Sequence, residues 1–240
     1  MNFQADAGSD AIQALKQLAA EQVLTYIQSG MVVGLGAGST AILAVRLLAE
    51  KLSRGELTAI LGIPCSQVIE AEARRLGIPL TTLENHQEID FTFDGADEVD
   101  PSLNLIKGGG GALLREKIVA QASRREIIIV DESKISPALG THWAVPVEVI
   151  PFGWRTQVVY LEHLGAQPRL RLSPDGAPYV TDQGNYILDS DFGPIADPYA
   201  LAARLDARTG IVCHGLFLGI AEEVIVAGAS GIQRLKRANS

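Results

Sequence analysis

The chain of 240 residues has few cysteines, a deficit of positive charge and no long apolar run, and each shortage excludes a class of protein. Its two cysteines, Cys65 and Cys213, show no C-x-x-C spacing, so neither a disulfide framework nor a zinc site is indicated. A net charge of −8 and a pI near 5.0 argue against nucleic acid or an anionic membrane as the main partner. No stretch approaches the ~20 apolar residues that a membrane-spanning helix needs.

The first ten residues are polar and lack the basic and then apolar order of a signal peptide. Hydrophobic residues make up 47% of the chain, which is enough for a sizeable core. We therefore expect a cytoplasmic protein with one large domain or two modest ones.

Strand-like and helix-like segments alternate in the first half of the chain. Apolar residues at helical spacing predict a helix over residues 10–28, with Asp10 and Gln13 as a capping box. Further helices are expected over 41–51, 66–76 and 112–123, and apolar strands over 31–34, 57–63, 78–83, 89–93 and 126–131. Nearly continuous apolar strands between amphipathic helices predict an α/β fold with a doubly wound, mostly parallel, Rossmann-like sheet.

The pattern changes near residue 137. Residues 145–151 read as a strand with prolines at its borders, which is typical of a sheet edge. Helices over 154–164 and 198–208 and short strands over 168–172, 179–181, 186–189 and 211–213 predict a smaller α+β domain. Residues 223–228 repeat the apolar texture of the first sheet and are expected to return to it. The predicted domains are thus 1–137 plus about 215–240, which form the catalytic domain, and about 138–214.

A glycine turn, residues 34–40 (Gly-Leu-Gly-Ala-Gly-Ser-Thr), lies between a predicted strand and a predicted helix. Free N–H groups and the positive end of a helix dipole make such a turn an anion cradle. The dinucleotide fingerprint fits poorly, because its third glycine falls at Ser39 and no acidic residue ends the next strand. A phosphate or a carboxylate is therefore favoured over NAD. Ser39 and Thr40 either donate hydroxyls to that anion or simply cap the helix.

Residues 93–117 gather the groups needed for acid/base chemistry. Carboxylates follow a predicted strand, and Lys107 with four glycines precedes a helix that carries Glu116. Such groups suit proton transfer on a small, oxygen-rich substrate. The residues leave alternatives open: Asx-type turns at Asp94, Asp97, Glu98 and Asp100, a divalent metal at those carboxylates, and a solvated Glu116 paired with Lys107 or Lys117.

These motifs, together with Asp-Glu-Ser-Lys at 131–134, occur in an order that resembles the type A ribose-5-phosphate isomerases. The resemblance runs from about Lys16 to the last strand, and Lys-Gly-Gly-Gly…Arg-Glu-Lys is its specific part. It implies that the chain interconverts D-ribose 5-phosphate and D-ribulose 5-phosphate through an enediol(ate), in the non-oxidative branch of the pentose phosphate pathway. It also implies no metal, no cofactor, and a homodimer or homotetramer.

The resemblance implies roles for the matching residues. Glu116 corresponds to the general base that moves a proton between C2 and C1, and Lys107 to the cation near the developing oxyanion. Asp94 and Asp97 correspond to carboxylates that hold sugar hydroxyls and assist ring opening. Substrate or phosphate contacts are implied for Lys16, Gly36, Gly38, Ser39, Thr40, Gly108, Gly109, Gly110, Asp131 and Lys134.

The chain departs from the family pattern in two places, and two rival functions stay open. The loop over residues 62–67 has fewer hydroxyls than the Ser/Thr-rich version of the family and keeps Ser66. Ala37 stands where the family often has a hydroxyl residue, which affects substrate affinity and sugar preference more than reaction type. One rival is another sugar-phosphate isomerase, a deaminase or a CoA transferase, and a trapped thioester would reveal the transferase. The other is a sugar-phosphate sensor of a transcription regulator, which would need a DNA-binding segment that this acidic chain does not display.

Overall fold

The computed structural model describes residues 4–237, with side chains from residue 13 onwards. The chain divides into two compact units, each built from separate stretches of sequence. Unit 1 contains the residues up to Gly95, Ile118–Lys134 and the residues from Ile220, and unit 2 contains Ala96–Lys117 and Ile135–Gly219. The domain boundaries predicted from the sequence stay a prediction. Within residues 4–237, no helix combines the length and the apolar character needed to cross a membrane.

Unit 1 is built on a six-stranded sheet in the order β13-β12-β6-β3-β1-β2. All neighbouring strands pair in parallel except β12 with β13, which is antiparallel. The strands are β1 Val32–Leu35, β2 Leu61–Pro64, β3 Phe91–Asp94, β6 Glu126–Asp131, β12 Glu223–Gly228 and β13 Gly231–Lys236. The predicted Rossmann-like fold class and the return of residues 223–228 to the first sheet are confirmed. The direction of winding reverses between β1 and β3, which is where such sheets usually bind ligands.

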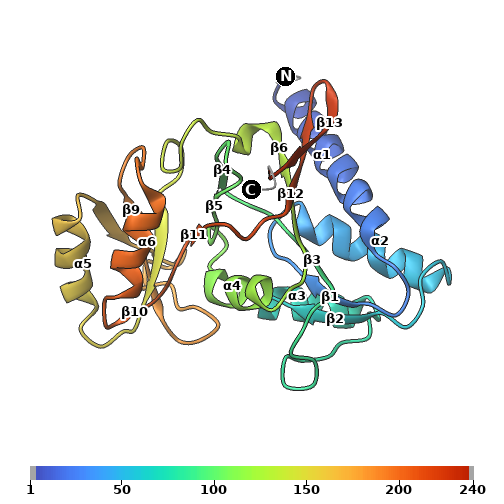
Figure 1. Cartoon of the computed structure of the whole chain (residues 1–240), viewed down its shortest axis with the longest axis horizontal. Coiled ribbons are helices and arrows are strands. Elements are labelled where there is room, and N and C mark those ends of the chain that lie inside the picture. Colours follow the sequence, from blue (N-terminus) through green and yellow to red (C-terminus); the bar gives the residue numbers. More distant parts are fainter. Residues whose placement is uncertain (1–3, 238–240) are drawn as a thin grey trace. The chain divides into compact units, whose positions relative to one another are not determined.

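Helices cover both faces of this sheet. They are α1 Gln4–Val23 with the short η1 Leu24–Tyr26, α2 Ala41–Ser53, α3 Gln67–Arg75, α4 Leu113–Gln121 and η2 Glu132–Lys134. Neighbouring residues of β1 point to opposite faces, so Val33 packs in the core with α1, α2 and α3, while Val32 packs in the cluster that contains Val119 of α4. Figure 1 shows α1 and α2 side by side. Helix α4 starts in unit 2 and ends in unit 1.

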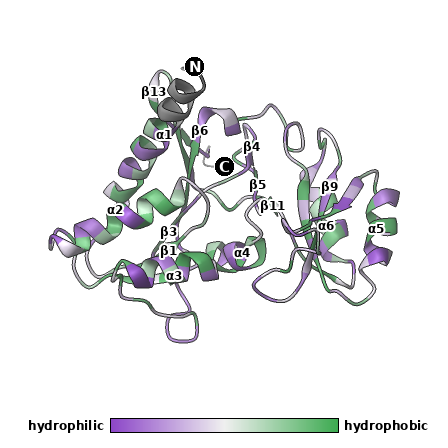
Figure 2. Ribbon diagram, turned by 180° about the vertical axis from the view of Figure 1, so that it is seen from behind, coloured by the Kyte–Doolittle hydropathy of each residue, from purple (hydrophilic) through white to green (hydrophobic). Residues whose placement is uncertain are grey.

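Helix α2 illustrates why these residues form helices. Its buried residues recur every three or four positions, at Ala41, Ala44, Val45, Leu48 and Ala49, so one face lies in the core. Figure 2 shows hydrophobic and hydrophilic residues along this helix and along α5. The core that these faces bury contains Phe91 and Phe93, each worth about 1.5–3 kcal/mol of transfer free energy.

Two sequence-based assignments in unit 1 are wrong, and one strand was missed. Helix α1 begins at Gln4, so Asp10 lies inside the helix and cannot open a capping box. Residues 78–83 form no strand and contribute only an isolated bridge between Gly62 and Leu80. Strand β13 was not predicted, because its alternation of exposed polar and half-buried residues is weak.

Unit 2 contains a four-stranded antiparallel sheet in the order β10-β7-β9-β8. Its strands are β7 Val145–Val149, β8 Gln167–Leu170, β9 Tyr186–Asp191 and β10 Ile211–His214, and its helices are α5 Trp154–His163 and α6 Pro198–Asp206. A second sheet orders β11 Leu216–Phe217, β5 Leu105–Ile106 and β4 Glu98–Val99. The predicted smaller α+β part is thus present, although residues 179–181 form no strand.

Strand β7 is not an edge strand as its prolines suggested, because it pairs with both β9 and β10. The position of Pro146 explains the error. Its carbonyl accepts a hydrogen bond from the N–H of Gly215, just after β10, over 2.7 Å. The ring nitrogen of Pro146 therefore also faces the β10 side of the strand. Strand β10 has already ended there, at His214, so the missing N–H of proline costs no ladder bond.

Candidate functional site

The glycine turn connects β1 to α2 and is held against the end of β3. The N–H of Gly36 donates to the carbonyl of Phe93 over 3.0 Å. A Cβ atom at Gly36 would lie 2.3 Å from that carbonyl oxygen and 2.5 Å from Cγ of Asp94. Only glycine permits this close approach. Gly38 has a φ of +94°, which also favours glycine.

The end of this turn has the properties of an anion site. Within residues 4–237, the N–H groups of Gly38, Ser39 and Thr40 have no protein acceptor. The ammonium of Lys16 donates to the hydroxyl of Ser39 over 2.9 Å, which brings a cation from α1 to the start of α2. Thr40 is the N-cap residue, but its side chain makes no capping bond. The simple capping interpretation therefore fails for Thr40, and Lys16 adds a positive charge at the same helix start.

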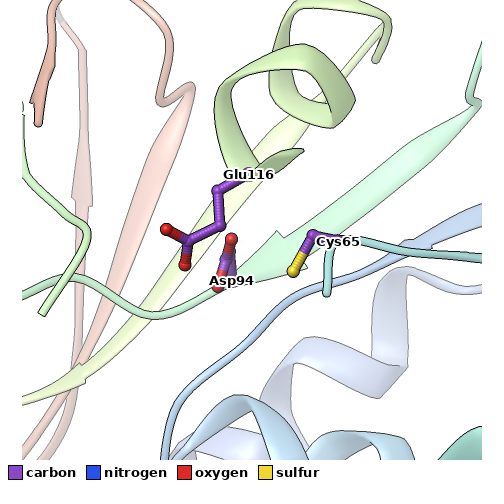
Figure 3. A group of neighbouring side chains, drawn as sticks. All are labelled: Cys65, Asp94 and Glu116. Carbon is purple, nitrogen blue, oxygen red and sulfur yellow. The ribbon is translucent and has the colours of Figure 1, made fainter. Parts of the chain in front are cut away.

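Asp94 is the last residue of β3 and is almost fully buried, at 1% exposure. Its Oδ1 accepts hydrogen bonds from the N–H of Ala37 over 2.9 Å and of Gly95 over 2.7 Å. The carboxylate thus fixes the glycine turn through the backbone of Ala37. Figure 3 shows Asp94 at the end of β3 and Cys65 directly after β2.

Asp131 and Lys134 lie at the end of β6. Oδ1 of Asp131 accepts from the N–H of Ser133 over 3.1 Å and also from the Ser133 hydroxyl. Lys134 is half-buried and ends η2. The structure therefore gives Asp131 a role in shaping the turn that carries Lys134.

In unit 2, the other carboxylates of the acidic turn separate into different roles. Asp97 accepts from the N–H of Gly109 over 2.7 Å, which ties it to the glycine loop. Glu98 is buried and accepts from three consecutive backbone N–H groups, those of residues 140–142, over 2.8–3.1 Å. Asp100 accepts from the N–H groups of Ser102 and Asn104, so the Asx-turn alternative holds for this residue.

Lys107 and Glu116 form a buried ion pair. Nζ of Lys107 lies 3.2 Å from Oε1 of Glu116, with the side chains 2% and 7% exposed. The Lys107 ammonium also lies 5.5 Å from the centroid of the Phe217 ring. Glu116 belongs to the first turn of α4, as predicted and as Figure 3 shows. The alternative of a solvated Glu116 is wrong, although the pairing with Lys107 that it included is present.

A second polar cluster in unit 2 was missed, because the histidines are scattered in the sequence. Nε2 of His214 contacts Asp206 Oδ1 over 3.1 Å, and Nδ1 accepts from the N–H of Leu216 over 3.2 Å. Lys117 donates to the carbonyls of His214 and Leu216 over 2.6 and 3.0 Å. Burial, and then the Lys117 charge, lower the pKa of His214 to about 4. Burial also lowers the pKa of Lys117 and raises that of Cys213 to about 11.

Two chemical capacities follow from these contacts. Unit 1 offers free N–H groups, a hydroxyl and a lysine at one helix start, a combination that binds an anion such as phosphate. Unit 2 offers a buried carboxylate paired with a buried ammonium, a combination that can move a proton and stabilise an oxyanion.

Comparison with known proteins relates the chain to one family. Residues 61–231 match the family ribose 5-phosphate isomerase A (phosphoriboisomerase A). The ribose-5-phosphate isomerase A of Chloroflexus aurantiacus is 58% identical over 220 residues, which cover 92% of each chain. That of Desulfatibacillum aliphaticivorans is 56% identical over 94% of this chain and 98% of its own. A D-ribose-5-phosphate isomerase solved with phospho-erythronic acid aligns with a TM-score of 0.92 and 40% identity, over 94% of this chain and 99% of that one.

Proposed function

The chain belongs to the ribose-5-phosphate isomerase A family, and from this premise we propose how its own residues isomerise the substrate. It is an isomerase that interconverts ribose 5-phosphate and ribulose 5-phosphate. The proposal concerns the intermediate, the base and the contacts that hold the sugar phosphate. The observation that supports it most directly is the buried Lys107–Glu116 pair, whose two residues lie on either side of the glycine loop in the sequence.

Glu116 acts as the general base. Its carboxylate takes the proton from C2 of the open-chain aldose, which leaves an enediolate with the negative charge on O1. The same group returns the proton to C1, and a proton passes from O2 to O1, which gives the ketose. Glu116 is 6% exposed, so its carboxylate is largely withdrawn from water, as suits a group that takes a proton from carbon.

Lys107 supplies the positive charge for the enediolate oxygen. An ammonium in a site that excludes water stabilises a developing oxyanion far more than it would in water, because the local dielectric is low. Lys107 is 2% exposed and already lies beside the carboxylate of the proposed base. It can therefore stabilise the negative charge that forms on the substrate oxygen when Glu116 removes a proton.

The remaining residues hold the substrate. We assign the phosphate to Gly38, Ser39, Thr40, Lys16 and Lys134, with Asp131 shaping the turn before Lys134. Gly36, expected from the sequence to contact it, instead fixes the turn, because its N–H donates to the carbonyl of Phe93. The free N–H groups of the glycine turn and the Lys16–Ser39 contact support this assignment. We assign the sugar hydroxyls and ring opening to Asp94 and Asp97, and backbone contacts to Gly108, Gly109 and Gly110. No metal and no organic cofactor takes part in the proposed reaction.

One experiment tests the reaction and the base together. The isomerisation of D-ribose 5-phosphate is measured with and without EDTA for the wild type, for E116Q and for E162Q, a control at an exposed glutamate of α5. We expect metal-independent turnover that falls on the order of 10²–10⁴-fold in E116Q and stays unchanged in E162Q. Unchanged turnover of E116Q would contradict the base, and EDTA-sensitive turnover would contradict the metal-free reaction.

We also propose that the enzyme works in the cytoplasm, within the pentose phosphate pathway, as a homodimer or homotetramer. The small number of cysteines supports the compartment. Exposed apolar side chains of unit 2, such as Phe152 at 89% and Val159 at 50% exposure, support self-association. Light scattering coupled to gel filtration measures the assembly, and a monomer at micromolar concentration would contradict it.

A further inference from the structure

Two side chains far along the sequence bind the carbonyl groups of the glycine loop. Nη1 of Arg171 donates to the carbonyl of Gly108 over 2.9 Å and to that of Gly109 over 3.1 Å. The hydroxyl of Tyr179 donates to the carbonyl of Gly110 over 3.4 Å. Three consecutive carbonyls thus face residues that follow them by more than 60 positions.

Arg171 is itself held rigidly. Its Nε donates to Oδ2 of Asp189 over 2.9 Å, and its Nη2 pairs with Oδ1 of the same carboxylate. Its backbone N–H donates to the carbonyl of Ile187 over 2.9 Å, and its guanidinium lies 5.9 Å from the Tyr179 ring centroid. A two-bond fork to a carboxylate fixes the orientation of a guanidinium, which leaves Nη1 aimed at the loop.

The opposite side of the loop is held as well. The N–H of Gly109 donates to Asp97 Oδ2, and a Cβ atom at Gly109 would lie 2.7 Å from the other oxygen of that carboxylate. A Cβ atom at Gly111 would lie 2.3 Å from the hydroxyl of Tyr179. The loop is therefore clamped between Asp97 on one side and Arg171 and Tyr179 on the other.

We propose that Arg171, oriented by Asp189 and assisted by Tyr179, is a positioning residue of the isomerase, which acts through the glycine loop and does not touch the substrate. The loop joins Lys107 to the helix that carries Glu116, so its conformation sets where both groups lie. The inference rests on the proposed roles of Lys107 and Glu116. Because misplacement of a reacting group by about 1 Å costs about 10²-fold in rate, loosening the loop affects catalysis.

The test compares R171Q with R169Q, since Arg169 lies two residues earlier, exposed on β8, and its replacement makes the same change of charge. We expect kcat/KM to fall about 10–100-fold in R171Q and to change less than about 2-fold in R169Q. Hydrogen–deuterium exchange, followed by mass spectrometry of peptides that cover residues 107–113, should be faster only in R171Q.

Unchanged kcat/KM in R171Q would overturn the inference. A loss of activity without faster exchange in residues 107–113 would also overturn it, because Arg171 would then act on something other than the loop. If R171Q does not fold, Y179F decides: it should lose about 2–5-fold in kcat/KM with faster exchange of the same peptides, and wild-type behaviour would overturn the inference. Failure of the proposed base is read separately, from the turnover of E116Q, which does not depend on the result for R171Q.

Discussion

The ammonium of Lys107 and the carboxylate of Glu116 lie 3.2 Å apart although they are nine positions apart in the sequence, and both are buried. The glycine loop makes this possible, because it reverses the chain between the end of β5 and the start of α4. The pair is therefore a property of the loop conformation as much as of the two side chains.

We expect K107M to destabilise the protein by about 3–5 kcal/mol, because it removes the cation beside a buried carboxylate while it keeps most of the side chain's volume. The double variant K107M/E116Q should lose less than the two single variants together, since both partners are then uncharged. Urea unfolding measures both effects. Additive losses would contradict an energetic coupling between the two residues.

We expect K16M to raise KM for ribose 5-phosphate about tenfold and to change kcat by less than about twofold, because a charge-assisted hydrogen bond to phosphate contributes about 1.5–3 kcal/mol. The control is K51M, which removes a lysine from the other end of α2. Steady-state kinetics at constant ionic strength separates KM from kcat. A fall in kcat with unchanged KM would contradict a phosphate-binding role.

The buried His214 should make the protein less stable in mild acid. Its pKa is lowered to about 4 in the folded state, so between about pH 6.5 and 4 the unfolded chain binds a proton that the folded chain does not. Stability is therefore retained above pH 6.5 and lost on the way down to pH 4, by a few kcal/mol at most. Urea unfolding of H214N should show a flatter pH dependence over this range, while H163N, at an exposed residue, should follow the wild type.

Neither cysteine should react with a thiol reagent while the protein is folded. Cys65 and Cys213 are buried, and burial raises the pKa of Cys213 to about 11, so almost none of it is thiolate at pH 7. We expect iodoacetamide to modify both residues in urea and neither in buffer, as measured by mass spectrometry. Rapid modification of Cys213 in buffer would contradict its burial.

The sequence predicted most of the sheet in unit 1 because those strands are buried on both faces and read as apolar runs, as in residues 126–131. It failed where tertiary pairing decides. Strand β7 lies inside its sheet because β9 and β10 both pair with it, and its Pro146 is tolerated because β10 stops short of the position opposite that residue. Residues 78–83 find only one bridging partner. Both outcomes depend on pairing between residues far apart in the sequence, so no short segment could predict them.

The candidate site shows the same division. Lys107, Glu116 and the glycine turn could be predicted because spacing and residue type coincide within short segments. The contacts of Arg171 and His214 could not, since their partners lie elsewhere along the chain. Glu98 seemed one of four equivalent carboxylates, and only the fold reveals that it holds the backbone of residues 140–142.

The position of β12 between β6 and β13 has a consequence for folding during synthesis. Its residues, 223–228, are synthesised long after those of β6, so until then the pairing edge of β6 has no neighbour on that side. A nascent chain on the ribosome thus carries an unfinished, strongly apolar sheet edge of the kind that attracts other strands. We expect ribosome-associated chaperones to matter more for this enzyme's yield than its modest size would suggest.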